Sequence, residues 1–319
     1  MSEIILDVQH LTKQYLKHTV VRDVSFQVQQ GTICGLIGPN GAGKTTIMKA
    51  LGGLIAPTSG SISLFGEKTE AGLAHSRSRM CFLIETPYAK QEMTARENLK
   101  KLCMQKGIPA EDQIDRVLNL VGLADTGKKQ VRNFSLGMRQ RLGIAGALLS
   151  NPEVMVLDEP VNGLDPEGIV EIRNLLLKLN REEHITILIS SHLLTELSLL
   201  CTDYVIIRSG EVIRRITADE LKRECHEYFR ISAADNTMLP AVLQNQLGIT
   251  DFTTEKDGSV RLNERTGEIE RISRTLYENG IIPVEMHMHD ANLEQYYMNL
   301  VGDTDVQRDE GAVISDRPA

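Results

Sequence analysis

Eight residues, Gly38 to Thr45, constrain the fold of this chain more than any other segment. They read G-P-N-G-A-G-K-T, the G-x-x-x-x-G-K-[ST] spacing of a loop that wraps its backbone N–H groups around phosphate oxygens. An apolar run, residues 32–37, precedes the loop, and a segment with helical spacing, residues 46–51, follows it. A strand, a glycine-rich loop and a helix in that order predict a phosphate site at a helix N-terminus within an α/β fold. The sequence therefore predicts that the chain binds a nucleoside triphosphate.

The residue types in the loop suggest how the nucleotide is held. Lys44 is expected to pair with the β- and γ-phosphates, and the Thr45 hydroxyl to bind Mg²⁺. The helix that follows adds about half a positive charge at its N-terminus. The residues expected to contact the nucleotide are Gly38, Pro39, Asn40, Gly41, Ala42, Gly43, Lys44, Thr45 and Thr46.

Bulk properties narrow the function further. A length of 319 residues suggests two domains, and a net charge of −8 gives no electrostatic support for a nucleic-acid partner. The five cysteines form no C-x-x-C pair, which indicates buried thiols in a reducing compartment. We find neither a secretory signal pattern at the start nor an apolar run of about 18 residues. We therefore expect a soluble, cytoplasmic chain whose membrane role, if it has one, needs a partner.

Periodicity predicts an ATPase-like core over residues 1–217. Two alternating segments should pair as an antiparallel β subdomain, with Tyr15 in the turn between them. Continuous apolar runs are typical of buried parallel strands, and a long central region with a capping box at Thr94 is mainly helical. The expected elements are strands 3–9, 20–28, 32–37, 79–84, 154–157 and 185–190, a helical insert at 92–150, and a hairpin at 204–213 around Ser209-Gly210.

The pattern changes near residue 218 and predicts a small α+β accessory domain, residues 218–301. Its order β-α-β-β-α-β is the ferredoxin-like arrangement. Residues 302–319 have few apolar side chains and are expected to be a disordered tail. The expected elements are strand 226–232, helix 237–247, strand 251–256, strand 259–263, helix 267–279, strand 281–288 and helix 291–300.

Four more motifs follow the phosphate loop. The strand that ends in Asp158-Glu159 supplies one carboxylate for Mg²⁺ and one to polarise the attacking water. Ser135 and Gly137 open a helix suited to a γ-phosphate. Gly163-Leu164-Asp165 comes after the carboxylates, and His192 ends the last core strand, where an imidazole can reach the γ-phosphate.

In these motifs the chain resembles the ATP-binding subunits of ABC transporters, over residues 3–215. The resemblance rests on Tyr15 as adenine-stacking residue, the phosphate loop, the signature 135–141, the carboxylate strand, the D-loop at Asp165 and the histidine. It implies an ATPase that uses ATP and Mg²⁺ and works with separate transmembrane subunits at the inner face of the cell membrane. It also implies a head-to-tail dimer, in which Ser135, Gly137, Gln140 and Asp165 join the partner's nucleotide site.

Two departures from the family pattern point to a branch. The signature reads S-L-G-M, and Glu85 stands where the family has a glutamine that contacts Mg²⁺ and couples to the membrane subunit. Gln91 is an alternative for that position but lies six residues later, past Pro87. With the segment 293–301, these features resemble the bacitracin-resistance and lantibiotic-immunity branch. The resemblance then implies catalytic roles for Glu85, Glu159 and His192, and Mg²⁺ contacts for Glu85, Thr45 and Asp158.

Three other functions compete with peptide-antibiotic export. One is a soluble ABC-type ATPase not coupled to transport, the second is a module that holds ATP without hydrolysis, and the third is export of a different hydrophobic substrate. A single nucleotide module and the absence of a long heptad run disfavour the ribosomal and DNA-repair types, and Glu159 with His192 disfavours a mere binding module.

Overall fold

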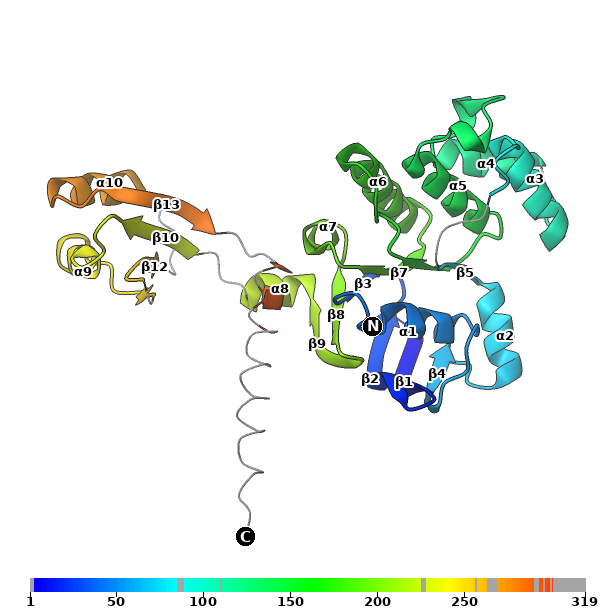
Figure 1. Cartoon of the computed structure of the whole chain (residues 1–319), viewed down its shortest axis with the longest axis horizontal. Helices are drawn as coiled ribbons and strands as arrows, with labels where there is room; N and C mark the ends of the chain where they lie inside the picture. The colour runs from blue at the N-terminus through cyan, green and yellow to red at the C-terminus, as the bar shows by residue number, and fades with distance from the viewer. Residues whose placement is uncertain are drawn as a thin grey trace, which may run out of the picture. The chain divides into compact units, whose positions relative to one another are not determined.

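The computed structural model describes residues 3–84, 89–109, 111–224, 228–255, 257–262 and 269–289, and residues 293, 294, 296–298 and 300. Contacts divide the chain into two compact units, residues 1–218 and 219–319, each described here by itself (Figure 1). Glu85 and the expected tail at 302–319 lie outside the described residues. In the described part of the chain, we find no helix with the length and apolarity needed to cross a bilayer.

The core of the first unit is a six-stranded sheet with the order β5-β6-β7-β3-β8-β9. Five strands run parallel, and β9 pairs antiparallel with β8 through the turn at Ser209-Gly210, as the hairpin pattern predicted. The strands are β3 (Ile33–Ile37), β5 (Met80–Leu83), β6 (Val154–Asp158), β7 (Thr186–Ser191), β8 (Asp203–Arg208) and β9 (Glu211–Thr217).

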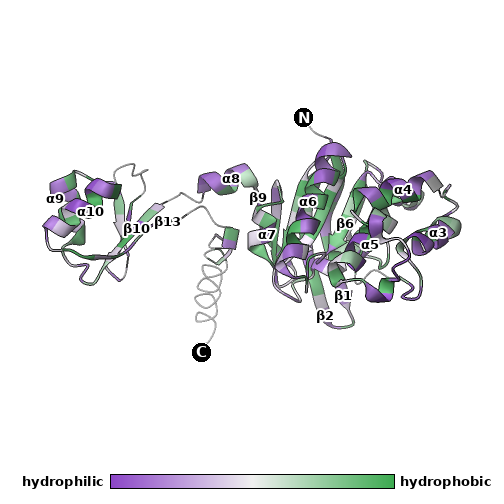
Figure 2. Ribbon diagram, turned by 90° about the horizontal axis from the view of Figure 1, so that it is seen from above, coloured by the Kyte–Doolittle hydropathy of each residue, from purple (hydrophilic) through white to green (hydrophobic). Residues whose placement is uncertain are grey.

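Both faces of this sheet are covered, which explains the continuous apolar runs. Every residue of β3 and β7 is buried. Helix α1 (Lys44–Leu51) packs on one side, and α5 (Leu136–Leu148), α6 (Pro166–Glu182) and α7 (Leu194–Ser198) lie on the other (Figure 1). Figure 2 shows the apolar colour concentrated on the strands and the polar colour on the outer turns of the helices. The strand ends therefore meet at one edge of a rigid layer.

A second, antiparallel sheet has the order β2-β1-β4. Strands β1 (Ile4–Tyr15) and β2 (His18–Gln29) are longer than predicted, so Tyr15 is the last residue of a strand and not part of the turn. The third strand, β4 (Ser59–Leu64), and the helix α2 (Glu70–Ser78) were not predicted from the sequence. Polar residues near the end of β1 interrupt the alternation, which hides the length of that strand.

The insert between β5 and β6 is mainly helical, as predicted. It contains α3 (Ala95–Lys106), α4 (Glu111–Leu120), two short 3₁₀ turns (Ala124–Thr126 and Val131–Asn133) and α5. The capping box is present, because the Thr94 side chain accepts from Glu97 N while the Glu97 carboxylate accepts from Thr94 N. Helix α6 begins with Asp165 as its N-cap and Pro166 in the first turn.

The second unit has the predicted ferredoxin-like order. Its sheet, β11-β12-β10-β13, is antiparallel throughout. A core that includes Phe229, Leu243 and Leu276 fills the space between the sheet and two helices. Of the helix expected at 291–300, residues 293, 294, 296–298 and 300 are helical. The elements are α8 (Ala218–Glu224), β10 (Tyr228–Ala233), α9 (Leu239–Leu247), β11 (Phe252–Thr254), β12 (Val260–Leu262), α10 (Ile269–Glu278) and β13 (Pro283–His289).

Candidate nucleoside triphosphate site

The phosphate loop connects the carboxyl end of β3 to α1, and its glycines are required by geometry. Gly41 and Gly43 have φ of 81° and 103°, values that side chains rarely adopt. A Cβ on Gly38 would lie 2.3 Å from the Ile207 carbonyl oxygen of β8, which is closer than any real contact. The loop is thus held tightly against the sheet, with its backbone free to surround an anion in front of the helix.

Lys44, the first residue of α1, is buried although it carries a charge. Its Nζ donates to the carbonyl oxygens of Gly38 (2.6 Å) and Pro39 (3.2 Å). The same Nζ lies 3.3 Å from Oε1 of Glu159 at the end of β6. A buried ammonium needs such partners, because an unpaired charge is costly away from water. The Lys44 ammonium is therefore held by two backbone carbonyl groups and one carboxylate.

Asp158 is the last residue of β6, and both of its carboxylate oxygens accept hydrogen bonds. Thr45 Oγ1 donates to Oδ2 (2.7 Å), and Ser190 Oγ of β7 donates to Oδ1 (2.5 Å). Ser190 Oγ also accepts from the backbone N–H of Glu159 (3.0 Å). Sequence reasoning placed Thr45 and Asp158 together but gave no role to Ser190, whose position in the Ser-Ser-His end of β7 was the available signal.

Glu159 has a strained backbone, and its two carboxylate oxygens face different partners. Its φ of 49° is rare for a residue with a side chain. Oε2 lies 2.8 Å from Nδ1 of His192, at hydrogen-bonding distance, while Oε1 faces Lys44. Oε1 is buried and makes no hydrogen bond, because the Lys44 contact is an ion pair without hydrogen-bond geometry. The structure thus brings together Lys44, Glu159 and His192, which come from three distant motifs.

The signature residues Ser135 and Gly137 lie at the N-terminus of a second helix, α5. Ser135 is the N-cap of α5 and accepts from Met138 N (3.1 Å). Gly137 is buried, and a Cβ there would make ordinary contacts, the nearest with Gly168 Cα at 3.8 Å. Gln140 is half-buried in the same helix. In the described residues, no hydrogen bond or ion pair joins Ser135 or Gly137 to the phosphate loop.

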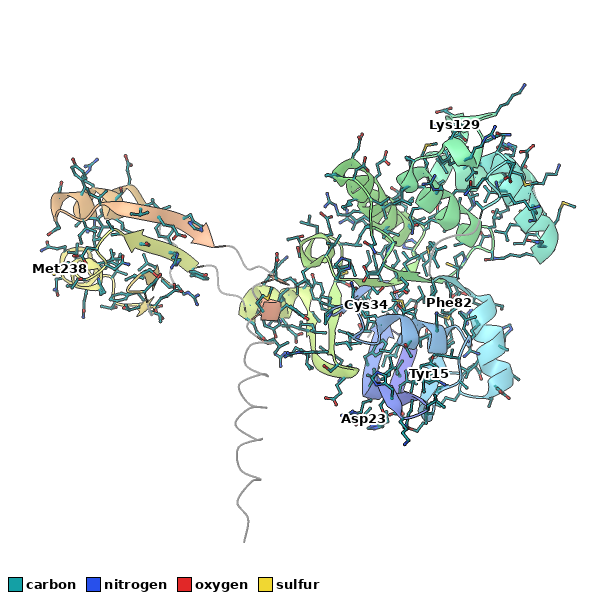
Figure 3. The ribbon with its side chains drawn as sticks, in the orientation of Figure 1. Tyr15, Asp23, Cys34, Phe82, Lys129 and Met238 are labelled. Atoms are coloured by element: carbon teal, nitrogen blue, oxygen red, sulfur yellow. The ribbon has the colours of Figure 1, made fainter. Side chains whose placement is uncertain are left out.

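Two further predicted residues take defined positions. Asp165 caps α6 by accepting from Gly168 N (3.1 Å). Tyr15 is 45% exposed, and Lys13 Nζ lies 4.9 Å from the centre of its ring. Figure 3 shows Tyr15 on the N-terminal sheet. A partly exposed ring with a cation beside it suits stacking of a base.

The coupling position can be described only in part. Glu85 lies outside the described residues, whereas Gln91 is described, and its carbonyl oxygen accepts from Arg132 N (2.9 Å). Next to this segment is a groove of about 530 Å³ between β5, α3 and α5. Apolar side chains such as Phe82 and Leu102 line it, and Lys90, Lys101 and Lys106 add positive charge.

Comparison with known proteins gives matches over both units. The bacitracin transport ATP-binding protein BcrA of Bacillus licheniformis is 40% identical over 298 residues, 93% of this chain and 97% of that protein. BcrA of Enterococcus faecalis is 36% identical over 95% of this chain and 98% of its own length. The lantibiotic transport ATP-binding protein SrtF of Streptococcus pyogenes is 41% identical over 66% of this chain and 89% of its own.

The solved structures agree with the fold of the first unit. An ATP-binding subunit of an ABC transporter, 33% identical, covers 69% of this chain and 92% of its own, with a TM-score of 0.59. CbiO1 of Clostridium perfringens, 26% identical, covers 70% of this chain and 92% of its own, with a TM-score of 0.64. The ABC transporter family model matches residues 21–162. The chain therefore belongs to the ABC transporter family, as an ATP-binding and ATP-hydrolysing protein with the α/β fold of these cassettes.

Proposed function

We propose that this ATPase powers the removal of a peptide antibiotic, of the bacitracin or lantibiotic type, through separate transmembrane subunits. The observation that carries this proposal is the match to the two bacitracin transport proteins, which extends over 93–95% of the chain and includes the second unit. The S-L-G-M signature and Glu85 agree with it. The charge of −8 supports no role for nucleic acid among the partners.

In the proposed mechanism, Lys44 changes partners when ATP arrives. Phosphate oxygens would replace the carbonyl groups and Glu159 around its Nζ, which leaves Oε1 of Glu159 available to a water molecule. Glu159 then acts as general base on that water, and His192 keeps the carboxylate oriented through the 2.8 Å contact. The positive φ of Glu159 is a strained conformation at the residue whose carboxylate would act on this water.

The residues present fit Mg²⁺. The Thr45 hydroxyl and Asp158 carboxylate already lie 2.7 Å apart and would supply oxygen atoms, the donors that Mg²⁺ prefers. No group of three His, Cys, Asp or Glu side chains in the described ranges could hold a metal by itself, which agrees with a site that needs ATP. When bound, Mg²⁺ would neutralise charge on the phosphates. We propose Glu85 as a third contact.

We propose that two copies complete the site head to tail. Among the described residues, no hydrogen bond or ion pair joins Ser135 or Gly137, at the N-terminus of α5, to their own phosphate loop. The γ-phosphate of a second copy fits this helix start by charge. Gln140 and Asp165 would lie at the same interface, and Tyr15 would stack on the adenine.

Coupling to the membrane subunits would use the loop with Glu85 and the groove beside α3. Apolar side chains and three lysines line the groove, so it suits a partner segment that carries apolar and acidic side chains. Contact there places the partner next to the strand that leads to Glu85. We propose that the chain is peripheral on the inner face of the membrane for this reason.

Bacitracin resistance of cells that carry the chain with its membrane partner tests the proposed function. We expect resistance with the wild-type chain and none with Glu159→Gln at equal expression. Co-purification with a polytopic membrane protein should accompany it. Resistance that persists in Glu159→Gln would contradict ATP-driven transport, whereas ATPase activity with no membrane partner would favour a soluble ATPase.

A further inference from the structure

One edge strand of the sheet in the second unit has no partner strand on its outer side among the described residues. In the order β11-β12-β10-β13, the two edge strands are β11, with three residues, and β13, with seven. Among the described residues, no strand pairs with the outer side of β13. Edge strands carry backbone groups that can pair with another chain, and proteins usually blunt them.

Hydrogen-bond parity shows which residues of β13 face outward. At the β11–β12 hairpin, Glu255 N donates to Ser259 O (2.8 Å), so Ser259 directs its backbone groups toward β11. Arg261, two residues later in β12, directs its groups to the same side. Arg261 therefore faces away from β10.

The same alternation continues across β10. Arg230 lies opposite Arg261 without hydrogen bonds between them, so Arg230 directs its backbone groups toward β13, where it lies opposite His287. His287 thus faces β10. Its neighbours Met286 and Met288 direct their N–H and C=O groups to the outer edge.

The outer edge is exposed and carries apolar side chains. Met288, 38% exposed, shares the helix-covered face with Met286, which packs against the core, whereas Val284, 72% exposed, is the extra residue at which the register shifts. Glu285 and His287 project on the opposite face, where their side chains lie 3.2 Å apart. The edge thus has an apolar row on one face and an acidic and a basic group on the other.

The sequence of β13, P-V-E-M-H-M-H, is complementary to itself when reversed about Met286. In an antiparallel pair of two such strands, Glu285 lies opposite His287 of the second copy, and Val284, at the bulge, comes next to Met288. Directly opposite side chains lie on the same face, so apolar meets apolar and carboxylate meets imidazole. Met286 meets its own copy on the two-fold axis through backbone hydrogen bonds.

We propose that β13 is a dimer contact, which joins the second units of two copies into one continuous sheet. The inference rests on the proposed dimer of the first units, which would hold the two strands at a high effective concentration. A short strand pair is weak alone, so it would form in the dimer and stabilise it. The partner is a second copy of this chain.

The two-fold pair uses β13 of both copies and leaves only the β11 edges open, and the start of β13 limits the length of the pair. The register shifts by one residue between Ser232 and Ala233 of β10, and Pro283, which has no N–H, begins the strand. A bulge and a proline prevent regular pairing beyond that point. The other edge, β11, is too short to extend the sheet, so the two-fold pair closes.

Cysteine cross-linking of the full chain tests the contact. Met286→Cys, made in a Cys225→Ser background, is treated with a short bismaleimide, with and without ATP in a Glu159→Gln chain. Thr254→Cys is the matched control, because Thr254 is exposed on the opposite edge strand, β11. We expect on the order of tenfold more covalent dimer for Met286→Cys than for Thr254→Cys when ATP holds the dimer.

Two controls separate the possible failures. Size-exclusion chromatography of the same ATP-bound sample reports whether the first units dimerise at all, so failure of the proposed dimer is seen independently. Equal cross-linking of the two variants, or none at Met286→Cys in a sample that is dimeric, overturns the contact. If the sample stays monomeric, cross-linking at Met286→Cys no greater than at Thr254→Cys overturns it as well.

Discussion

Replacement of Glu159 by glutamine should separate ATP binding from hydrolysis. The carboxylate lies 3.3 Å from Lys44 Nζ, and both side chains are largely buried. At an effective dielectric constant of about 20, the attraction at that distance is about 5 kcal/mol. ATP must displace this pair, so loss of the charge removes an opposing interaction. Burial of the two charges also costs desolvation, which offsets much of this attraction.

We therefore expect ATP affinity of Glu159→Gln to lie between unchanged and about tenfold tighter, a gain of up to about 1.4 kcal/mol. Turnover should fall about 10²-fold or more, because the general base is lost. The purified variant should also accumulate as an ATP-bound dimer. Equilibrium binding of ATP with Mg²⁺, single-turnover hydrolysis and size-exclusion chromatography measure the three quantities.

A matched control is available just before the start of β6, the strand that ends in Asp158. Glu153 precedes β6 and pairs with Arg79 (2.6 Å) far from the loop lysine, so Glu153→Gln makes the same chemical change outside the site. Its turnover should equal that of the wild type. A tenfold loss of ATP affinity in Glu159→Gln, or turnover within about fivefold of wild type, would refute the reasoning from the Lys44–Glu159 pair.

Three further predictions follow from other residues. The hydrogen bond from Arg79 lowers the pKa of Glu153, so this pair stabilises the fold above the unfolded pKa of about 4.5, and the stabilisation is lost as pH falls through the lower folded value. The free energy of unfolding in urea should therefore fall less between pH 6 and about pH 3.5 in Glu153→Gln than in the wild type. Equal losses in the two chains would contradict this. Burial raises the pKa of Cys81 to about 12, so a thiol reagent at pH 8 should label it only after unfolding, and fast labelling of the native chain would contradict its burial. Glu85→Ala should change ATP affinity less than about tenfold yet remove most peptide resistance in cells, and full resistance at equal expression would contradict a coupling role.

Much of the fold was predictable because apolar patterns report burial directly. The strands that lead to the site, β3, β6 and β7, are covered on both faces and appear as uninterrupted apolar runs. The ferredoxin-like order of the second unit followed from its alternation of strands and helices. Strand β4 was missed because S-G-S-I-S-L is short and half polar, and its Gly60, with φ of 89°, packs against the His10 carbonyl, which no local pattern reveals.

The site was predictable at the level of motifs and not of contacts. Lys44, Asp158 and Glu159 were recognised from spacing, because phosphate loops and carboxylate strands have fixed chemistry. The bond from Ser190 to Asp158 joins residues 32 positions apart and depends on the pairing of β6 with β7, which the sequence does not specify. The ion pair of Lys44 with Glu159 likewise arises only when the strand ends meet.

ATPase activity of mixed variants tests most directly the claim that two chains complete each site. Lys44→Ala removes the lysine that would bind phosphate in the chain's own phosphate loop. Gly137→Asp adds a carboxylate at the N-terminus of α5, where its charge repels phosphate, and a Cβ at this position meets no atom closer than 3.8 Å. Each variant alone should be inactive, while their mixture contains dimers with one intact site made from the two wild-type halves. The account predicts activity in the mixture well above that of either variant, and equal, negligible activity in all three samples, with mixed dimers shown to form, would contradict it.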